Sequence, residues 1–467
     1  MHLVFIDREN ELNFLEQKWK SSKSELVIIY GRRGIGKTEL IKRFMQGKNS
    51  YYFFVTTEDI ETLLESFMSA LGPPYRGIKP RNLEEFFNIL GDLSEKERLA
   101  VIFDEFQRLT EVYKGALSLL QKVWDERLSK TRIFVILVGS SVSVLERIGK
   151  SYDSPLYGRR TGMLEIKELD YWAFRKYFRG YSEEDKIRTY TILGGTPLYM
   201  SKFDDNLSLK ENISSKILEK GSELYDEPEI LLLQETRDPA PYMSILRAIA
   251  KGHNRFSEIS DISGIERHKL PKYLDVLMSK LRLVERIYPI EEKGRGLYYI
   301  KDNFLRFWFR YILPHKFMLE LGKKDETLEI IMKDIDNLAS KAFEKISEQF
   351  LLRINGLKID DHTIKFNKIG RWWKKEKEID LIAINELEKK VYFIECKYTS
   401  KPVRKSVLFD LTKKVDEFKW KKNKRDEIYV IFSKSGFTFE GDENTILLDL
   451  ESMVRFVEKN IKIQVIE

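Results

Sequence analysis

The segment GRRGIGKT, residues 31–38, has the residue types and the spacing of a loop that binds phosphate groups. It satisfies the pattern G-x-x-x-x-G-K-[ST], in which glycines allow backbone N–H groups to face a polyphosphate. In this pattern we expect Lys37 to reach the β and γ phosphates of ATP, and the Thr38 hydroxyl to coordinate Mg²⁺. The predicted nucleotide-binding residues are Gly31, Arg32, Arg33, Gly34, Ile35, Gly36, Lys37 and Thr38.

Two carboxylates could complete a hydrolytic site around this loop. Asp104 and Glu105 directly follow the apolar run LAVIF. We expect Asp104 to hold Mg²⁺ through water and Glu105 to polarise the water that attacks the γ phosphate. The alternative is that Glu105 is only a charge at the end of a strand.

Hydroxyls and arginines further along the chain could act on the γ phosphate. The run IFVILVGSS ends in Ser140 and Ser141, which we expect beside that phosphate as sensing groups. Arg159 and Arg160 follow in the glycine-containing stretch SPLYGRRTG. Either arginine could be a finger that stabilises transition-state charge, in its own subunit or in a neighbouring one. A solvated basic turn is the equal alternative.

A second group of charged residues has the types needed for metal-assisted attack on phosphorus. Asp380 and Glu395 offer hard oxygen ligands to Mg²⁺ or Mn²⁺, and Lys397 could activate the attacking water. Glu395 and Lys397 stand two apart on an expected strand, and therefore on one face. Glu344, on an expected helix, could bind a second metal or orient a water, and Glu378 is a reserve ligand. The alternative is an Asp380–Lys397 salt bridge in a degenerate domain that dimerises or holds DNA.

The phosphate-binding residues must be positioned by an α/β domain. Apolar runs at 25–30, 98–105 and 132–141 alternate with helical stretches. This pattern predicts a mostly parallel sheet with flanking helices over residues 1–164. Residues 165–235 become helical and charged, and we expect a helical lid there.

The second half of the chain is expected to contain two more units. Residues 236–314 read as helices followed by a hairpin, which is the order of a winged helix. The polar stretch 315–335 is expected to be a linker, and 336–467 a separate α/β unit that carries the second charged group. The predicted fold class is therefore α/β and multidomain.

Clusters of basic residues indicate DNA as a partner. The third helix and the wing of the expected winged helix carry Arg267, His268, Lys269, Lys272, Lys293 and Arg295. Two later clusters interleave cations with tryptophans, a combination suited to phosphate contact and base stacking. Their members are Lys365, Lys368, Arg371, Trp372, Trp373, Lys374 and Lys375, then Lys419, Trp420, Lys421, Lys422, Lys424 and Arg425. The alternatives are a solvated helix face and core tryptophans.

Length and composition limit the class of protein. A chain of 467 residues, 42% of them hydrophobic, exceeds one ordinary core and indicates several globular domains. No apolar run approaches the roughly 18 residues of a membrane span, and the start MHLVFIDRENEL is too acidic for a signal peptide, so we expect a cytoplasmic protein. One cysteine excludes an internal disulfide, and five unpaired histidines argue against structural zinc.

Six segments together resemble the archaeal ATPases of the AAA+-related signal-transduction class. In order they are FIDRENEL, the phosphate loop, FDEFQ, LVGSS, LYGRR and GGTPLYM. The resemblance implies a P-loop ATPase with a helical lid, a winged helix and a C-terminal domain related to restriction endonucleases. It also implies that the segment containing Arg8 contributes to the nucleotide site, and that Glu344, Asp380, Glu395 and Lys397 correspond to a nuclease pattern.

Two hypotheses about function remain open on the sequence. In the first, an Mg²⁺-dependent ATPase controls a C-terminal domain that binds DNA and could cut it. In the second, the ATP state controls oligomerisation of a signalling switch whose nuclease-like tail is inactive. An ATP-dependent homo-oligomer fits both hypotheses, and no membrane partner is expected.

Overall fold

The first sheet of the computed structural model, which describes residues 5–291, 295–359 and 361–466, is built from the predicted apolar runs. Its strand order is β3-β4-β5-β2-β6, and all neighbouring strands are parallel. The strands are β2 (Glu25–Tyr30), β3 (Ser50–Phe54), β4 (Leu99–Asp104), β5 (Ile133–Gly139) and β6 (Gly162–Glu165). Every residue of β2, β4 and β5 is buried, as expected for a parallel sheet covered on both faces. The predicted α/β core is confirmed.

Helices cover the two faces of this sheet because successive strand residues point in opposite directions. Val27 and Ile29 pack with α1 (Glu9–Lys20) and α2 (Lys37–Met45) on one face. Leu26 and Ile28 belong to the core of the other face. Its helices are α3 (Ile60–Leu71), α4 (Leu83–Lys96), α5 (Gln107–Val112), α6 (Ala116–Glu126) and α7 (Val142–Lys150).

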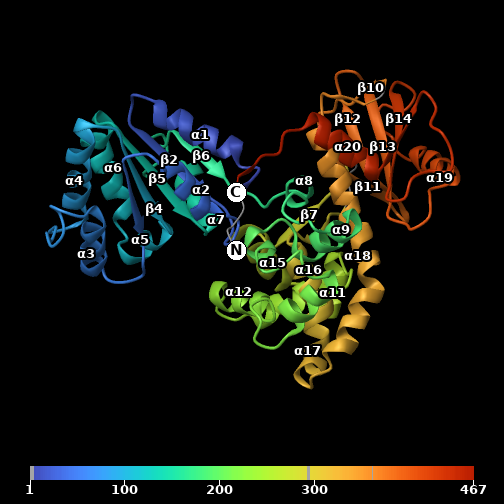
Figure 1. The fold of residues 1–467 in the computed structure, drawn as a ribbon, viewed down its shortest axis with the longest axis horizontal. Coiled ribbons are helices and arrows are strands. Elements are labelled where there is room, and N and C mark those ends of the chain that lie inside the picture. The colour runs from blue at the N-terminus through green and yellow to red at the C-terminus, as the bar shows by residue number, and fades with distance from the viewer. Residues whose placement is uncertain (1–4, 292–294, 360, 467) are drawn as a thin grey trace.

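A helical region occupies the middle of the molecule (Figure 1). It contains α8 (Tyr171–Phe174), α9 (Glu183–Leu193), α10 (Pro197–Met200), α11 (Leu209–Asn212) and α12 (Glu227–Glu235). The expected order of helices and then a hairpin follows, as α13 (Ala240–Ala250), α14 (Phe256–Ser263), α15 (Leu270–Asp275), β7 (Val284–Ile287) and β8 (Leu297–Ile300). Next come α16 (Asn303–Phe307) and α17 (Leu313–Glu320). Lys293, expected in the wing, lies outside the described residues.

The stretch 315–335, expected to be a linker, is helical. It contains most of α17 and the beginning of α18 (Lys324–Arg353), a helix that runs from the helical region to the C-terminal sheet (Figure 1). Thr327, Ile331 and Ile335 recur every four residues on one face of α18 and are buried. These few buried residues are separated by many charged ones, so the composition of the stretch suggested a polar linker and concealed the helical spacing.

The C-terminal sheet has mixed topology. Its order is β11-β12-β13-β14-β15; β11, β12 and β13 pair antiparallel, and β13, β14 and β15 pair parallel. One face packs on α18 and α20 (Leu450–Asn460), and the other on α19 (Ser406–Val415). The strands are β11 (Lys368–Lys374), β12 (Lys377–Asn385), β13 (Lys390–Lys397), β14 (Asp426–Ser433) and β15 (Thr445–Asp449), with β9 (Lys358–Ile359) and β10 (His362–Thr363) paired outside the sheet.

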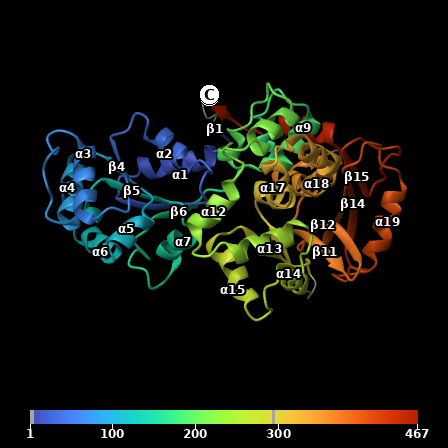
Figure 2. The same cartoon turned by 90° about the horizontal axis from the view of Figure 1, so that it is seen from below.

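The two ends of the described chain meet between the sheets. β1 (Phe5–Ile6) pairs antiparallel with β16 (Val465–Ile466), so that the segment after α20 returns to the N-terminal domain (Figure 1). Seen from below, the helical region lies between the two sheet domains (Figure 2). No helix within the described ranges is long and apolar enough to cross a membrane.

Candidate nucleotide site and carboxylate cavity

The phosphate-binding loop lies between the end of β2 and the start of α2. Gly34 and Gly36 have φ of +80° and +90°, in the left-handed region that favours glycine. A Cβ on Gly34 would also lie 2.7 Å from the Cβ of Leu198, in the segment that follows GGTP. The loop therefore requires glycine for its backbone conformation and for its contact with α10.

Lys37 is buried within the loop that it is expected to serve. Its Nζ donates hydrogen bonds of 2.8 Å to the carbonyl oxygens of Gly31 and Arg32. Burial lowers the pKa of Lys37 to about 8, against the opposing effect of Glu105 and Asp104. A bound polyphosphate would supply the negative charge that this buried ammonium lacks.

Oxygen ligands suited to Mg²⁺ meet where β4 ends. The Thr38 hydroxyl donates a 3.0 Å hydrogen bond to Oδ2 of Asp104, and the Tyr52 hydroxyl donates one of 2.5 Å to the same oxygen. A hydroxyl and a carboxylate this close fit the preference of Mg²⁺ for hard oxygen ligands, directly or through water. Burial and then the hydrogen bond to Asp104 raise the pKa of Tyr52. Sequence reasoning missed Tyr52, because its partner lies on a neighbouring strand 52 residues away.

Glu105 is held by its neighbours rather than left as a free strand-end charge. Its backbone has φ of +56°, and its Oε2 accepts a 2.7 Å hydrogen bond from the Ser140 hydroxyl. Gln107 Nε2 donates to the same oxygen. A positive φ on a non-glycine residue is a local strain of the kind found at functional sites. The Gln107 contact was not foreseen, although Gln107 ends the FDEFQ segment.

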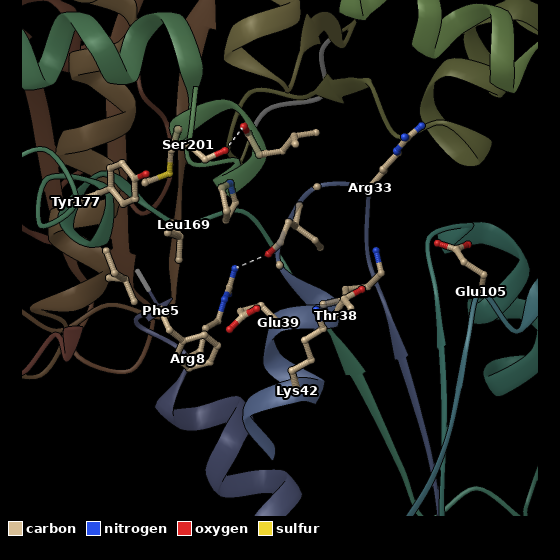
Figure 3. Close-up of a pocket in the computed structure, with 18 residues that line it drawn as sticks. Phe5, Arg8, Arg33, Thr38, Glu39, Lys42, Glu105, Leu169, Tyr177 and Ser201 are labelled. Carbon is tan, nitrogen blue, oxygen red and sulfur yellow. Dashed lines mark hydrogen bonds between the residues drawn. The ribbon is translucent and has the colours of Figure 1, made fainter. Parts of the chain in front are cut away.

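A cavity of about 340 Å³ extends along the loop. Figure 3 shows Phe5, Leu169 and Tyr177 on one side of the loop and Glu105 on the other. The first side offers apolar and aromatic surface suited to a nucleobase, and the second lies at the phosphate end. Sequence reasoning missed Leu169 and Tyr177, because the cavity joins them to the loop only in the folded chain.

The predicted arginines divide between the site and the surface. Arg8 lies at the edge of the cavity, where its guanidinium donates to the carbonyl oxygen of Ile35 at 3.4 Å. Ile35 and Arg33 also line the cavity. Arg32 instead forms a 2.8 Å ion pair with Asp302, the N-cap of α16, and so ties the loop to the helical region.

The two finger candidates face away from the loop in this single chain. Arg159 forms a bidentate pair with Asp125, at 2.8 and 3.0 Å. Arg160 donates to the carbonyl of Gly149. Neither lines the nucleotide cavity. Within one chain these contacts agree with the alternative of a basic turn. They do not bear on a role of either arginine in a neighbouring subunit.

The C-terminal carboxylates line a second cavity, of about 680 Å³. Glu344, Glu378 and Asp380 reach it from α18 and β12, and the hairpin and α16 form its opposite wall. Arg371 lies 3.2 Å from Glu344, and it also pairs with Glu378. The guanidinium therefore occupies the space between these two carboxylates.

Glu395 and Lys397 share a face, as the alternation predicts, but they pair with each other. Lys397 Nζ lies 2.6 Å from Glu395, and Lys414 Nζ lies 3.0 Å from the same carboxylate. Asp380 accepts a 2.8 Å hydrogen bond from the backbone N–H of Cys396. Burial, then the charges of Glu344 and Glu395, raise the pKa of Asp380 to about 7.

Metal binding in this second cavity is therefore less well supported than at the phosphate loop. Across the part of the chain that the structure describes, no group of three or more His, Cys, Asp or Glu side chains is placed to hold a metal ion. The expected ligands Asp380 and Glu395 are close, but the cations on Glu395 already compensate its charge.

Three members of the predicted DNA-binding clusters have structural roles instead. Trp372 is fully buried and packs edge-on against Phe418, so it is unable to stack on a base. The side chain of Arg425 is 1% exposed and pairs with Glu427. Trp420 is partly buried against the same core as Trp372. For the two tryptophans, the structure supports the alternative that they belong to the core. The side chain of Arg425 is buried as well.

Exposed cations remain at several of the other predicted positions. Arg267, His268, Lys269 and Lys272 lie on the surface at the start of α15. Lys375, Lys419 and Lys424 are exposed around the C-terminal sheet. The surface around these cations is therefore basic, although Trp372, in the middle of the first cluster, belongs to the core.

The parallel sheet, the glycine loop and the acid at the end of β4 define a P-loop nucleoside triphosphatase. Residues 5–203 match a family model described as an ATPase domain predominantly from Archaea. Residues 308–431 match a second model, described as "Archaea bacterial proteins of unknown function". The second match covers the end of the helical region and most of the C-terminal sheet.

Comparison with whole proteins gives the family. The chain is 34% identical over 460 residues to the uncharacterized protein MJECL04 of Methanocaldococcus jannaschii, covering 96% of this chain and 99% of that one. It therefore belongs to the same family of archaeal-type P-loop ATPases.

Shorter matches agree with this family. A 46-residue stretch, 10% of this chain, is 52% identical to 78% of the uncharacterized ATP-binding protein MJ0423 of the same organism. The Walker-type ATPase Paby2304 of Pyrococcus abyssi has a similar structure, with a TM-score of 0.51 and 25% identity over 65% of this chain and 96% of that one.

Proposed function

We propose that the protein is an Mg²⁺-dependent ATPase whose nucleotide state controls a C-terminal DNA-binding domain. The observation that carries the proposal is the meeting of Thr38, Asp104 and Glu105 beside the loop, with a 3.0 Å contact between the first two. Mg²⁺, when bound with ATP, supplies charge neutralisation at the phosphates. Thr38 and Asp104 are the residues that would hold it.

The remaining site residues divide the work of hydrolysis. Lys37 exchanges its two loop carbonyls for phosphate oxygens when ATP binds. Glu105 accepts the proton of the attacking water, and Ser140 keeps the Glu105 carboxylate oriented. Arg159 or Arg160 would act only from a neighbouring subunit, since within one chain both are engaged elsewhere.

Two direct contacts support control of the C-terminal domain by the nucleotide. β16 pairs with β1, and Phe5 and Ile6 of β1 line the nucleotide cavity. At the end of α18, Arg353 pairs with Asp7 and Asp170. A change in the shape of the cavity therefore reaches the C-terminal unit without an intervening linker.

DNA is the partner that the exposed cations favour. They occur at the start of α15, in the region proposed to be a winged helix, and around the C-terminal sheet. The mixed order of that sheet and the proximity of Asp380, Glu344 and Glu395 support a relationship to restriction endonucleases.

The second candidate is a switch whose C-terminal domain holds DNA or a second copy without cutting. The ion pairs of Glu395 with Lys397 and Lys414, and of Glu344 with Arg371, favour it. These pairs compensate the carboxylates without a metal ion.

Hydrolysis is tested by measuring ATP turnover with Mg²⁺. Lys37→Ala should abolish turnover, while Lys23→Ala, an exposed lysine away from the cavity, should not change it. Undiminished turnover in Lys37→Ala would contradict the proposal.

Cleavage is tested with supercoiled and linear DNA in Mg²⁺ or Mn²⁺. Nicking that is lost in Asp380→Ala and Lys397→Ala but kept in the exposed control Glu376→Ala would establish a nuclease. Equal inactivity of the wild type and all variants, with DNA binding retained, would establish the switch.

A further inference from the structure

The carboxylate cavity is shared by two parts of the chain. α18, β11 and β12 supply one wall, and α13, the hairpin and α16 supply the other. The parts touch directly, because Ile290 N–H donates a 2.8 Å hydrogen bond to the carbonyl oxygen of Arg371, and Lys368 lies 2.7 Å from Glu291. Any ligand of this cavity therefore contacts both parts.

Most cations around this cavity are matched by a carboxylate. Arg310 lies 2.7 Å from Asp334, and Lys341 lies 2.8 Å from Glu344. Lys345 lies 2.7 Å from Glu348, and Arg371 pairs with Glu344 and Glu378. These ion pairs leave little net charge on this part of the wall.

Arg306 of α16 differs from those cations. Among the described residues its guanidinium makes one hydrogen bond, of 3.1 Å, to the side-chain oxygen of Asn303, and no carboxylate lies within ion-pair distance. Its Nε is buried without a partner. Burial lowers the pKa of Arg306, although the charges of Glu344 and Asp302, which lie beyond ion-pair distance, oppose this effect. A partly buried arginine with no ion-pair partner is energetically costly unless a ligand supplies the anion.

Aromatic rings and the size of the cavity narrow the chemical class of that ligand. Tyr288 of the hairpin loop lines the cavity and is 54% exposed, and Tyr299 lines it with one face against Arg371, 5.3 Å from the ring centre. A volume of about 680 Å³ lies within the roughly 300–1,000 Å³ range of pockets for small molecules. An aromatic wall, a guanidinium without an ion-pair partner and this volume suit a single nucleotide rather than an intact duplex.

We propose that this cavity binds the phosphate group of a nucleotide, with Arg306 as the residue that takes the phosphate and Tyr288 as a surface for the base. The phosphate belongs either to the end of a nucleic-acid strand or to a free nucleotide. Arg306 lies outside the Asp380, Glu395 and Lys397 pattern and comes from the opposite wall. The inference deepens the proposed function, and its strand-end version rests on the DNA-binding part of that function.

The test compares small probes in a Lys37→Ala background, which removes the phosphate loop as a competing site. Thermal shift and calorimetric titration in EDTA would use a dinucleotide with a 5′-phosphate, the same dinucleotide without it, and thymidine 5′-monophosphate. We expect the phosphorylated dinucleotide to bind about 10- to 100-fold more tightly than the unphosphorylated one, as for hydrogen bonds to a charged group. Equal binding of both dinucleotides, or of neither, would overturn the inference.

Arg306→Met separates a ligand contact from a structural role. Without ligand, this variant should melt at the same temperature as its parent or higher, because it removes a partly buried charge that has no ion-pair partner. It should also lose the preference for the 5′-phosphate. A lower melting temperature together with an unchanged preference would show that Arg306 is only structural.

Arg310→Met is the matched control, because Arg310 lines the same cavity but is paired with Asp334. It should lower the melting temperature and keep the phosphate preference. Binding of thymidine 5′-monophosphate as tight as that of the dinucleotide identifies a free nucleotide, and weaker binding identifies a strand end. If both fail to bind while wild-type ATP turnover and duplex binding persist, the cavity inference alone is wrong.

Discussion

The orientation of Glu105, for which we propose a role in hydrolysis, depends on the groups around it. Its position after an apolar run was enough to propose a water-activating carboxylate. Its orientation comes from Ser140 and Gln107, whose side chains both bond the same carboxylate oxygen. The carboxylate is therefore already aimed before ATP binds.

The residue-scale prediction that follows concerns Glu105→Gln. The amide can still accept from Ser140, but it is unable to take a proton from water. We expect kcat for ATP to fall about 100-fold or more, which is the range for loss of a general base, while ATP affinity stays within a few-fold. Steady-state turnover and a nucleotide titration measure the two effects. Turnover near that of the wild type would show that Glu105 is only a charge at the end of a strand.

Asp380 predicts a pH dependence of stability for the metal-free protein. Its pKa rises from 3.8 to about 7 on folding, so the folded state holds a proton that the unfolded state has lost. The stability contribution of Asp380 therefore falls as the pH rises through this window. In EDTA, Asp380→Asn should melt above the wild type at pH 8, and the difference should shrink at pH 5.

The control for this pH series is Asp361→Asn, at a fully exposed side chain. It should show no difference from the wild type that changes with pH. A constant difference for Asp380→Asn across the series would mean that Asp380 is already ionised in the folded protein.

Among individual residues, the sequence predicted site residues well where they are neighbours in the chain. Residues 31–38 form one continuous loop, so pattern and spacing were sufficient. Tyr52 and Arg306 were not found, because the groups that surround them lie on other elements of the folded chain. Gln107 was not found although its partner Glu105 is only two residues away. Trp372 was assigned to DNA because a strand residue gives no sign of which face the core will cover.

At the scale of elements, the contact between the end of α18 and β1 carries a prediction. Arg353 pairs with Asp7 and Asp170, and all three side chains are partly buried. Arg353→Ala should destabilise the protein by about 1–3 kcal/mol, since two carboxylates lose a charge-assisted partner. Because Asp7 follows the strand that lines the cavity, KM for ATP should rise. Denaturant unfolding and ATPase kinetics measure both.

Arg455→Ala is the comparison for this variant. Arg455 lies 3.6 Å from Glu451 on α20, and both side chains are largely exposed. Such a surface pair should contribute within about 1 kcal/mol and leave KM unchanged. Equal effects of the two substitutions would remove the proposed link between α18 and the nucleotide strand.

Elements whose patterns were purely apolar were predicted well, and those with mixed patterns were not. β2, β4 and β5 coincide with the predicted runs to within a residue or two. The beginning of α18 was read as a linker, because Thr327, Ile331 and Ile335 are embedded among charges. The pairing of β16 with β1 was not foreseen either, since two residues contain no signal for a partner more than 450 positions away.

For the whole molecule, the distribution of exposed cations predicts how DNA binding responds to salt. Lys272 is exposed on α15 in the region proposed to be a winged helix. Lys272→Ala should weaken binding to different DNA sequences to a similar extent and reduce the slope of log K against log salt by about 1. Anisotropy titrations at several salt concentrations measure this slope.

Arg425→Ala tests the same assignment from the buried side. Because the Arg425 guanidinium pairs with Glu427 and donates to the carbonyl oxygen of Trp420, its loss should reduce stability without changing the salt slope. A smaller slope for Arg425→Ala than for Lys272→Ala would place DNA on the C-terminal sheet instead.

The length of α18 gives the molecule a mechanical property. Thirty helical residues make a rod of about 45 Å, anchored beside α17 at one end and ending in Arg353 at the other. For such a rod, a tilt of about 5° displaces the far end by roughly 4 Å, more than the reach of a hydrogen bond. Buried residues from Thr327 to Leu351 hold α18 against both the helical region and the C-terminal sheet. A small displacement of either part along this rigid helix would therefore be felt at the contact of Arg353 with Asp7, beside the nucleotide strand.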